Sequence, residues 1–217
     1  MKMLTINDFK KSYNTHLIVQ IDKLEIGSGI HWFRGVNGSG KSTFFKSVAG
    51  LLPFEGQIVL EDRYDIRKNA VDYRLRVNYA EAEPLYPDYL TGKDLIKFIA
   101  EAKKSPNGQT EKLIEALQIG DFVANQVGTY SSGMLKKLSL VLAFLGNPSI
   151  IMLDEPLITI DVQAVANMYA LINEYQQMGV TFLLSSHQDF RFDELNITQT
   201  YLVKDKTINL ETQQPQQ

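Results

Sequence analysis

The sequence predicts an α/β fold with a mostly parallel sheet, an antiparallel β subdomain and an inserted α-helical subdomain. Residues 3–60 contain short alternating segments typical of strands, whereas residues 88–146 have a helical periodicity that no strand interrupts. Two continuous apolar runs, 149–153 and 180–184, have the composition of buried parallel strands. With 217 residues and 44% hydrophobic content, the chain is long enough to bury one core with a subdomain.

The beginning of the chain favours an antiparallel layer. Residues 3–9 and 17–26 alternate between apolar and polar side chains, with Tyr13-Asn14 as the turn between them, and residues 57–60 give another short strand after a glycine. Tyr13 has two interpretations, and both stay open. Its ring stacks on a nucleobase, or it is a half-buried turn tyrosine.

A glycine-rich loop follows the apolar residues 30–33. Its sequence from 35 to 43, Gly-Val-Asn-Gly-Ser-Gly-Lys-Ser-Thr, matches the phosphate-binding pattern G-x-x-x-x-G-K-[ST]. The motif requires a strand before it and a helix after it, and a helix is expected over residues 41–49 with Gly50 at its end. This context favours the motif over a plain Gly/Ser turn with a surface lysine. The sequence therefore predicts a P-loop NTPase core.

Each fixed position of the loop has a separate physical role. Gly35, Gly38 and Gly40 are expected to adopt positive φ and to bring backbone N–H groups close to phosphate oxygens. Lys41 is expected to reach the β- and γ-phosphates, and the Ser42 hydroxyl to bind Mg²⁺. The candidate nucleotide-binding residues of the loop are Gly35, Asn37, Gly38, Ser39, Gly40, Lys41, Ser42 and Thr43.

Three helices are expected between residues 91 and 146. The first has one apolar stripe, the second is expected to begin at Thr110 and end at Gly120, and the third to run from about Met134 to Gly146. The lysine pair at 136–137 is expected on the solvated face of the third helix. Since no strand interrupts this block, it predicts a helical subdomain.

Two adjacent carboxylates, Asp154 and Glu155, follow the apolar run 149–153. Carboxylates at the end of a buried strand are costly without a positive partner, and we expect this partner to be Mg²⁺. Asp154 would hold the metal through water, and Glu155 would orient and deprotonate the attacking water. The alternative is a solvated acidic turn, which the presence of the phosphate loop disfavours.

His187 follows the second apolar run, which comes after a helix expected over residues 162–178. Gly35, Asp154 and His187 thus each lie just beyond an apolar strand, and ligands bind at that edge of an open parallel sheet. We expect His187 to donate a hydrogen bond to the γ-phosphate and to register its presence. Residues 199–210 are expected to form a closing pair of strands.

Composition excludes several classes of function. The net charge is −3 and no Lys/Arg run exceeds two residues, so no nucleic-acid partner is indicated. The absence of cysteine excludes disulfides and thiolate metal sites. Residues 1–20 have no signal-peptide pattern, and no apolar run approaches the roughly 18 to 20 residues of a transmembrane helix. Any membrane role is therefore expected to act through a partner.

With these residues in this order, the chain resembles the nucleotide-binding subunit of ATP-binding cassette (ABC) transporters over residues 3–210. The match consists of Tyr13 at the adenine-stacking position, the phosphate loop, Tyr130-Ser131-Ser132-Gly133-Met134 at the signature position, Asp154 and Glu155 after their strand, Asp161 in the following D-loop and His187 as the switch histidine. The resemblance implies an ABC-type ATPase domain at 1–210, with a helical subdomain at about 88–146 and a polar, disordered tail at 211–217.

The resemblance also implies a subunit that hydrolyses Mg·ATP and dimerises around it, as a homodimer or pseudo-dimer. ATP would lie between the phosphate loop of one subunit and Ser131 and Gly133 of the other, and Asp161 counts among the nucleotide-binding residues. The chain would be cytoplasmic and would bind a separate membrane-spanning permease, which would make it peripheral at the inner face of the cell membrane. Residues 84–91 are more similar to exporters than to importers, which predicts export.

Two departures from the family pattern bear on activity. The signature retains Ser131 and Gly133 but has Tyr-Ser-Ser-Gly-Met where the family commonly has Leu-Ser-Gly-Gly-Gln. Ala82 stands where the family carries a glutamine near the metal, with Glu81 or Glu83 as substitutes. Two alternatives to a transport ATPase therefore stay open. They are an ATP-dependent dimerising switch with little turnover and a soluble, non-transport ABC ATPase.

Overall fold

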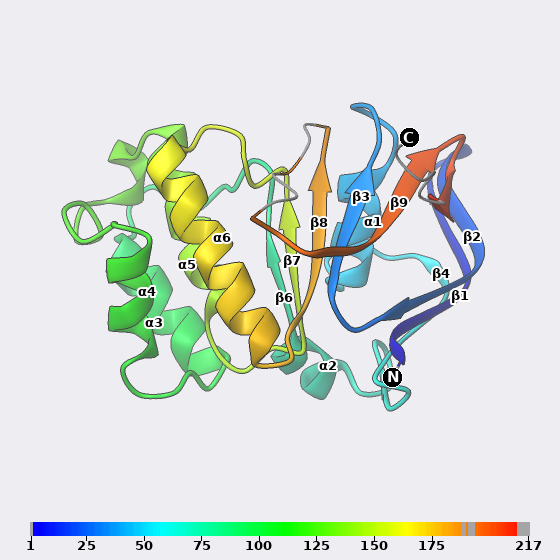
Figure 1. Ribbon diagram of the computed structural model, residues 1–217, viewed down its shortest axis with the longest axis horizontal. Helices are drawn as coiled ribbons and strands as arrows, with labels where there is room; N and C mark the ends of the chain where they lie inside the picture. The colour runs from blue at the N-terminus through cyan, green and yellow to red at the C-terminus, as the bar shows by residue number, and fades with distance from the viewer. Residues whose placement is uncertain (1, 188–189, 191–193, 212–217) are drawn as a thin grey trace.

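The computed structural model describes residues 2–187, 190 and 194–211. A central sheet has six strands in the order β10-β9-β3-β8-β7-β6, and a second sheet has four strands in the order β2-β1-β4-β5 (Figure 1). In chain order the strands β1 to β10 are Lys2–Tyr13, His16–Gly27, Ile30–Arg34, Glu55–Leu60, Tyr64–Asp65, Val77–Ala80, Ile150–Asp154, Thr181–Ser186, Ile197–Lys204 and Thr207–Leu210. In the central sheet every pairing is parallel except that of β9 with β10. The predicted mostly parallel sheet is confirmed.

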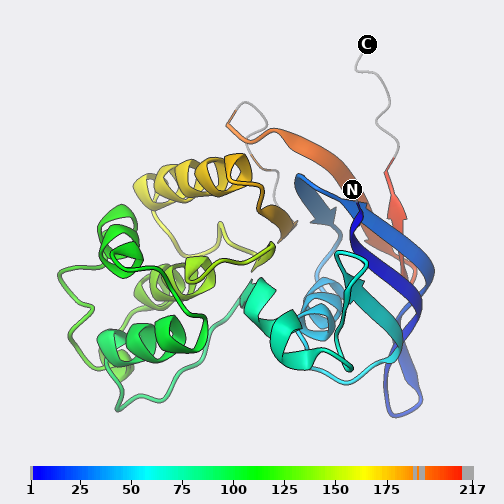
Figure 2. The same cartoon turned by 90° about the horizontal axis from the view of Figure 1, so that it is seen from below.

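Helices cover both faces of the central sheet. They are α1 (Lys41–Val48), α2 (Ala70–Arg76), α3 (Gly92–Ala102), α4 (Gln109–Ala116), the 3₁₀ turn η1 (Val127–Thr129), α5 (Ser132–Phe144) and α6 (Val162–Gln177). Figure 2 shows α1 between the central sheet and the antiparallel sheet, and α3, α4 and α5 grouped on the opposite side of the molecule. The predicted antiparallel layer is also present, since β1 pairs antiparallel with β2 and β4.

Strand β7 shows why a continuous apolar run predicts a buried parallel strand. Ile150 and Met152 belong to the core cluster that includes α1, whereas Ile151 and Leu153 belong to the cluster that includes α5 and α6. Successive side chains of a strand point to opposite faces of the sheet, and here both faces are covered by apolar side chains. Each of the four is fully buried.

The second helix of the helical block differs from the sequence prediction at both ends. α4 begins after Gly108, whose φ of 80° turns the chain into the helix, so Thr110 lies inside the first turn and does not cap it. The helix ends at Ala116, short of Gly120. Gln118 takes a left-handed φ of 54°, which stops the helical hydrogen bonding there.

The third helix begins earlier than the sequence predicts. α5 starts at Ser132, two positions before Met134. The Ser131 hydroxyl oxygen accepts the Met134 amide at 3.3 Å, which satisfies one of the free N–H groups of the first turn. Ser131 is therefore the N-cap of this helix, a role that its side chain also suits by residue type.

Strand β6 and helix α2 have no counterpart in the sequence prediction. A polar residue, Asn78, lies in the middle of β6 and is buried. Its side-chain amide donates to the carbonyl oxygens of Ala143 and Leu145, each at 2.8 Å, at the end of α5. Because this amide is satisfied by carbonyls from a distant helix, the strand tolerates a residue type that hides its apolar pattern.

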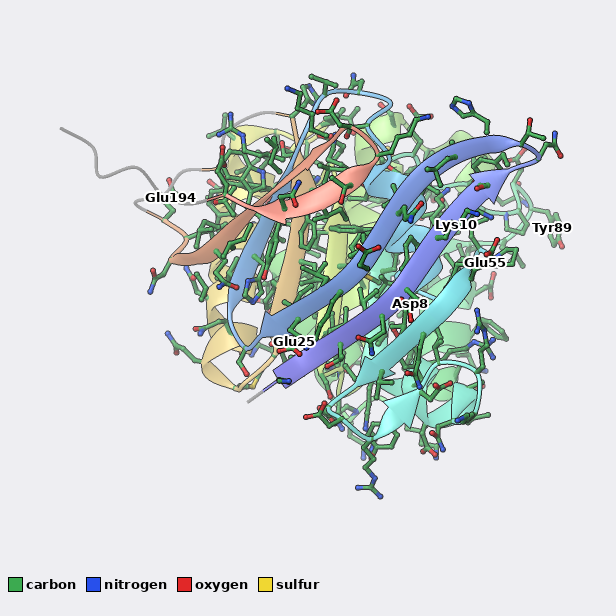
Figure 3. The ribbon with its side chains drawn as sticks, turned by 90° about the vertical axis from the view of Figure 1, so that its right-hand side faces the viewer. Asp8, Lys10, Glu25, Glu55, Tyr89 and Glu194 are labelled. Atoms are coloured by element: carbon green, nitrogen blue, oxygen red, sulfur yellow. The ribbon has the colours of Figure 1, made fainter. Side chains whose placement is uncertain are left out.

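A bulge reverses the faces of the antiparallel sheet along β1. Leu4 and Ile6 are buried, yet Asp8 and Lys10, at the same parity, are exposed, and Figure 3 shows their side chains on this sheet. Asp8 has a left-handed φ of 51° within the register shift between β1 and β4. Opposite it, a Cβ on Gly56 would lie 2.3 Å from the Asp8 carbonyl oxygen, so only glycine fits there.

The helical block joins the core through α5, which contacts β6 and β7. The boundary of a helical subdomain at about 88–146 stays a prediction. The predicted tail stays a prediction as well, because residues 212–217 lie outside the described residues. Within the part of the chain that the structure describes, no helix has the length and hydropathy needed to cross a membrane.

A buried histidine on β3 predicts a loss of stability at acidic pH. His31 is fully buried, with its Nε2 3.0 Å from the Gly27 carbonyl oxygen, and burial lowers the pKa of this imidazole below its ordinary value. His31 therefore binds a proton more readily in the unfolded chain than in the folded one. The contribution of neutral, buried His31 to the free energy of unfolding is complete above about pH 6.5 and is lost as the pH falls below this value. The loss is up to about 1.4 kcal/mol per pH unit.

The measurement is denaturant unfolding of the wild type and of His31→Gln between about pH 5 and pH 7.5. The variant keeps an amide donor toward Gly27 and is expected to lose less free energy of unfolding on acidification than the wild type. An equal loss in both proteins would assign the pH dependence to other groups.

Candidate nucleotide-binding site

Strands β3, β8 and β7 lie side by side, and the predicted site residues follow their C-terminal ends. β3 pairs with β8 and β8 with β7, all in parallel, so Arg34, Ser186 and Asp154 end at the same edge of the sheet. From these ends the chain continues into the glycine-rich loop, His187 and Glu155 respectively. The sheet thereby brings together residues that are far apart in the sequence.

A cavity of about 690 Å³ opens at this edge. Its wall is formed by the glycine-rich loop, the segments that follow β6 and β7, the beginning of α5 and the end of β8. The lining residues are Ile18, residues 37–43, residues 82–85, Ser132, Leu135, Glu155, Ile158, Thr159 and His187. The volume lies within the range of cavities that bind small molecules, roughly 300–1,000 Å³.

Of the three loop glycines Gly35, Gly38 and Gly40, two have the expected backbone conformation. Gly38 and Gly40 have φ of 79° and 105°, and Gly40 is the N-cap of α1. The expectation of positive φ is wrong for Gly35. There a Cβ would lie 2.5 Å from the Val203 carbonyl oxygen, so close approach of β9 requires the glycine. Residues 41–43 line the cavity, so the N-terminus of α1 presents its free N–H groups and partial positive charge to it.

Lys41 contacts its own loop. Its Nζ donates to the carbonyl oxygens of Gly35 at 2.7 Å and Val36 at 3.3 Å, and lies 3.6 Å from Oε1 of Glu155. The side chain is buried, so this ammonium is a nearly desolvated charge. Phosphate oxygens are stronger acceptors than loop carbonyls, and an anion in the cavity would compete for the same three N–H donors.

Asp154 is fully buried, and both of its carboxylate oxygens accept hydrogen bonds. The Tyr79 hydroxyl donates to Oδ2 at 3.0 Å, and the Ser185 hydroxyl donates to Oδ1. Burial, together with the charge of Asp154, raises the pKa of Tyr79, so its hydroxyl stays a donor. Neither Tyr79 nor Ser185 has a signal in the sequence, because each meets Asp154 only through the pairing of neighbouring strands.

The site contains the oxygen ligands that Mg²⁺ prefers. Ser42 is part of the cavity wall, whereas Asp154 ends β7 and is not among the residues that line the cavity. Among the residues that the structure describes, no group of three or more His, Asp or Glu side chains is arranged to hold a metal ion by itself. This donor set fits Mg²⁺, since this ion is commonly held by one or two protein ligands together with phosphates and waters.

Glu155 connects the loop lysine with the histidine. Its Oε1 lies 3.6 Å from Nζ of Lys41, and its Oε2 lies 2.9 Å from Nδ1 of His187. The backbone φ of Glu155 is 45°, an uncommon left-handed value whose cost is of the order of 1–3 kcal/mol. A carboxylate, an ammonium and an imidazole therefore meet at one side of the cavity, where a base can accept a proton from water beside a bound anion.

Five of the predicted nucleotide-binding residues lie outside the cavity wall, among them Gly35, which packs against β9. Tyr13 is at the β1–β2 turn, 48% exposed, with the Nζ of Lys11 4.6 Å from its ring centroid. Ser131 and Gly133 lie at the beginning of α5, and Asp161 lies before α6. Their roles toward a nucleotide stay predictions. For Ser131 and Gly133, the resemblance places the nucleotide on a second subunit.

The prediction that Lys136 is solvated is wrong. This side chain is 1% exposed, and its Nζ donates to the carbonyl oxygens of Glu81 at 2.8 Å, Ala82 at 3.1 Å and Asp154 at 2.8 Å. Burial lowers its pKa to about 8. One helical turn separates Lys136 from the fully buried Leu140, and this spacing is the sequence signal for an inward-facing lysine.

Lys137 is also engaged with protein groups. Its Nζ lies 2.9 Å from Oδ2 of Asp161, while Oδ1 of the same aspartate accepts the Ala164 amide at 2.8 Å and caps α6. Asp161 thus links the beginning of α6 to α5. The contacts that the structure gives to this aspartate are those of a helix cap and an ion pair.

Known proteins resemble this chain in sequence. The family model described as ABC transporter matches residues 23–158. The lantibiotic transport ATP-binding protein SrtF of Streptococcus pyogenes is 28% identical over 187 residues, which cover 85% of this chain and 80% of the relative. The cytochrome c biogenesis ATP-binding export protein CcmA of Legionella pneumophila is 26% identical over 202 residues, which cover 92% of this chain and 100% of the relative.

Solved structures share the fold. The structure of an ATP-binding subunit of an ABC transporter has a TM-score of 0.86 at 22% identity, with 97% of this chain and 90% of that chain covered. A nucleotide-free ATP-binding cassette from an ABC transporter has a TM-score of 0.75 at 20% identity, with 96% and 90% covered. The predicted fold class and the resemblance are confirmed. The family model spans more than half of the sequence, and the chain belongs to the ABC transporter family, within which it is a nucleotide-binding subunit.

Proposed function

We propose that this chain is the Mg·ATP-hydrolysing subunit of a transporter. The observation that carries the proposal is the convergence of Lys41, Glu155 and His187 on one cavity at the end of three parallel strands. The N-terminus of α1 at the same cavity supports binding of the phosphates there. Phosphate release by the purified chain in Mg·ATP, and none when EDTA removes the metal, tests the proposal. ATP binding without phosphate release would favour the dimerising switch.

Each polar group has one task in this proposal. The loop N–H groups and Lys41 bind the β- and γ-phosphates, and Lys41 exchanges its loop carbonyls for phosphate oxygens. Asp154 and Ser42 hold Mg²⁺, which neutralises phosphate charge when bound. Glu155 accepts the proton of the attacking water. His187, whose Nδ1 lies beside Glu155, donates from Nε2 to the γ-phosphate.

Dimerisation around ATP is part of the same proposal. Ser131 and Gly133 stand at the beginning of α5, and the first turn of this helix contains no acidic side chain that would offset its partial positive charge. Such a helix end suits a phosphate supplied by a second subunit. A homodimer and a pseudo-dimer with a related chain both satisfy this geometry.

A membrane-spanning permease is the proposed partner. An apolar cavity of about 510 Å³ lies among α2, β6 and α3, and large apolar side chains are exposed around it, among them Leu51, Val71 and Leu85. An exposed apolar groove of this kind favours a protein partner. The relatives SrtF and CcmA are named as transport and export proteins, which supports a transporter and, together with the form of residues 84–91, export. The chain would then sit at the cytoplasmic face of the cell membrane.

Replacing Val71 by aspartate tests this partner surface. Val71 is 73% exposed, so the fold should be kept, while a carboxylate in an apolar interface is expected to lower recovery of an integral-membrane protein with the tagged chain by about tenfold or more. The measurement is purification from detergent-solubilised membranes. Met178→Asp, at an exposed apolar position after α6, is the matched control and should leave recovery unchanged. Equal recovery with both variants would contradict the assigned surface.

A further inference from the structure

Lys136 lies in an environment that is rare for a lysine. Its side chain is 1% exposed, and its ammonium is surrounded by the carbonyl oxygens of Glu81, Ala82 and Asp154 at 2.8, 3.1 and 2.8 Å. An ammonium has three N–H donors and no acceptor. All three donors are therefore used on backbone carbonyls. Lys136 is also not among the residues that line the nucleotide cavity, so any effect that it has on the site acts through the backbone that it holds.

The position of this ammonium continues the pairing of β6 with β7. The parallel ladder runs from Val77 opposite Ile150 to Ala80 opposite Leu153. The next residue along each segment is Glu81, just after β6, and Asp154, the last residue of β7, and the ammonium of Lys136 joins their carbonyls. The Lys136 side chain, which comes from α5, thus connects the two strands at the point where their pairing ends.

The connection fixes the peptide unit between the proposed metal ligand, Asp154, and the proposed base, Glu155. Its carbonyl, that of Asp154, accepts from Lys136, and its N–H, that of Glu155, donates to the Ser185 carbonyl oxygen at 3.1 Å. Both ends of this peptide are therefore held by hydrogen bonds. Because Glu155 has a left-handed φ of 45°, the orientation of the peptide before it decides where the Glu155 carboxylate points.

A second contact comes from the same strand. The Tyr79 hydroxyl on β6 donates to Oδ2 of Asp154 at 3.0 Å. The segment 79–82 therefore reaches Asp154 twice, at its side chain through Tyr79 and at its backbone through Lys136. Ala82, whose carbonyl accepts from Lys136, also lines the nucleotide cavity.

We propose that Lys136 is a positioning residue for ATP hydrolysis, which holds the Asp154–Glu155 peptide in place and fixes residues 81–82 against it. This inference rests on the proposed hydrolysis of Mg·ATP. Ala82 has no polar side-chain atom to connect this segment to the site, and the lysine supplies a connection through the backbone. Its loss leaves the phosphate-binding loop intact but frees the base at Glu155.

The test compares Lys136→Met with Lys103→Met. Lys103 is a partly buried lysine whose Nζ donates to the carbonyl oxygens of Arg74 and Val77, at the other end of β6. Lys136→Met is expected to lower kcat by about 30-fold or more with KM for Mg·ATP within about threefold, and Lys103→Met to keep kcat within about threefold. If Lys136→Met does not fold, Lys136→Gln is tested in its place, because glutamine keeps two donors on a shorter side chain.

Hydrogen exchange without nucleotide gives a second measurement that does not depend on turnover. Lys136→Met should raise exchange in peptides covering 80–84 and 150–158, and Lys103→Met should raise it near 74–77 instead. Unchanged kcat in Lys136→Met, equal loss of kcat in both variants, or unchanged exchange at both segments would overturn the proposal. If the wild type hydrolyses no ATP, the proposed function fails, while the exchange comparison still decides whether Lys136 holds these segments.

Discussion

Replacement of Glu155 by glutamine is expected to reduce phosphate release from Mg·ATP by about 10²–10⁴-fold, the contribution that a general base typically makes. The amide has nearly the shape of the carboxylate and can occupy the place between Lys41 and His187, but it cannot take a proton from water. ATP binding should be retained, because the loop and Lys41 are unchanged. The variant is therefore expected to accumulate as an ATP-bound dimer.

Phosphate release, equilibrium ATP binding and light scattering in Mg·ATP measure these three expectations. Glu174→Gln is the matched control, since Glu174 forms an ion pair with Lys112 on the surface of the helical region. It should retain wild-type turnover, and loss of activity in Glu155→Gln purified in the same way excludes a contaminating ATPase as its source. Undiminished release by Glu155→Gln would remove the assigned base, whereas a variant that binds ATP and stays monomeric would contradict dimerisation around ATP.

Replacement of Lys41 by alanine is expected to weaken ATP binding by about 100-fold and to abolish turnover. The ammonium is buried at the phosphate loop, where its donors now meet two loop carbonyls and the Glu155 carboxylate. Charge-assisted hydrogen bonds to phosphate are strong in such a desolvated place, and alanine supplies none. The glycine-rich backbone remains, so binding should be weakened more than the fold is.

Stabilisation by ATP gives a direct readout of this change. With ATP at about 100 times the wild-type Kd, the free energy of unfolding of the wild type should rise by about 2.7 kcal/mol, and that of Lys41→Ala by only about 0.4 kcal/mol. Lys10→Ala removes the same charge from the exposed surface of the antiparallel sheet and is expected to behave as the wild type. Equal stabilisation of Lys41→Ala and the wild type would place the phosphates elsewhere.

Local sequence rules were sufficient for the elements whose pattern is contained within a few consecutive residues. The phosphate loop is recognisable because Gly35, Gly40 and Lys41 have fixed spacing, and a short loop needs particular residue types for its backbone. Strands β7 and β8 are recognisable because both of their faces are buried, which leaves a continuous apolar run. Strand β6 cannot be recognised in this way, because the buried Asn78 interrupts its apolar run. The side-chain amide of Asn78 is instead hydrogen-bonded to backbone carbonyls at the end of α5.

Within the site, the sequence indicates which residues carry charge and where strands end, and the packing of distant segments determines what holds those residues. Glu155 and His187 are evident as acidic and basic residues just beyond apolar runs, but their 2.9 Å contact depends on β7 and β8 being neighbours. Lys136 looks like a surface lysine by residue type. It is buried because three carbonyls from two separate segments, 55 residues away at the greatest separation, satisfy its ammonium where α5 packs across the ends of β6 and β7. A hydrogen bond between groups so far apart in the chain has no local period, so only the assembled fold reveals it.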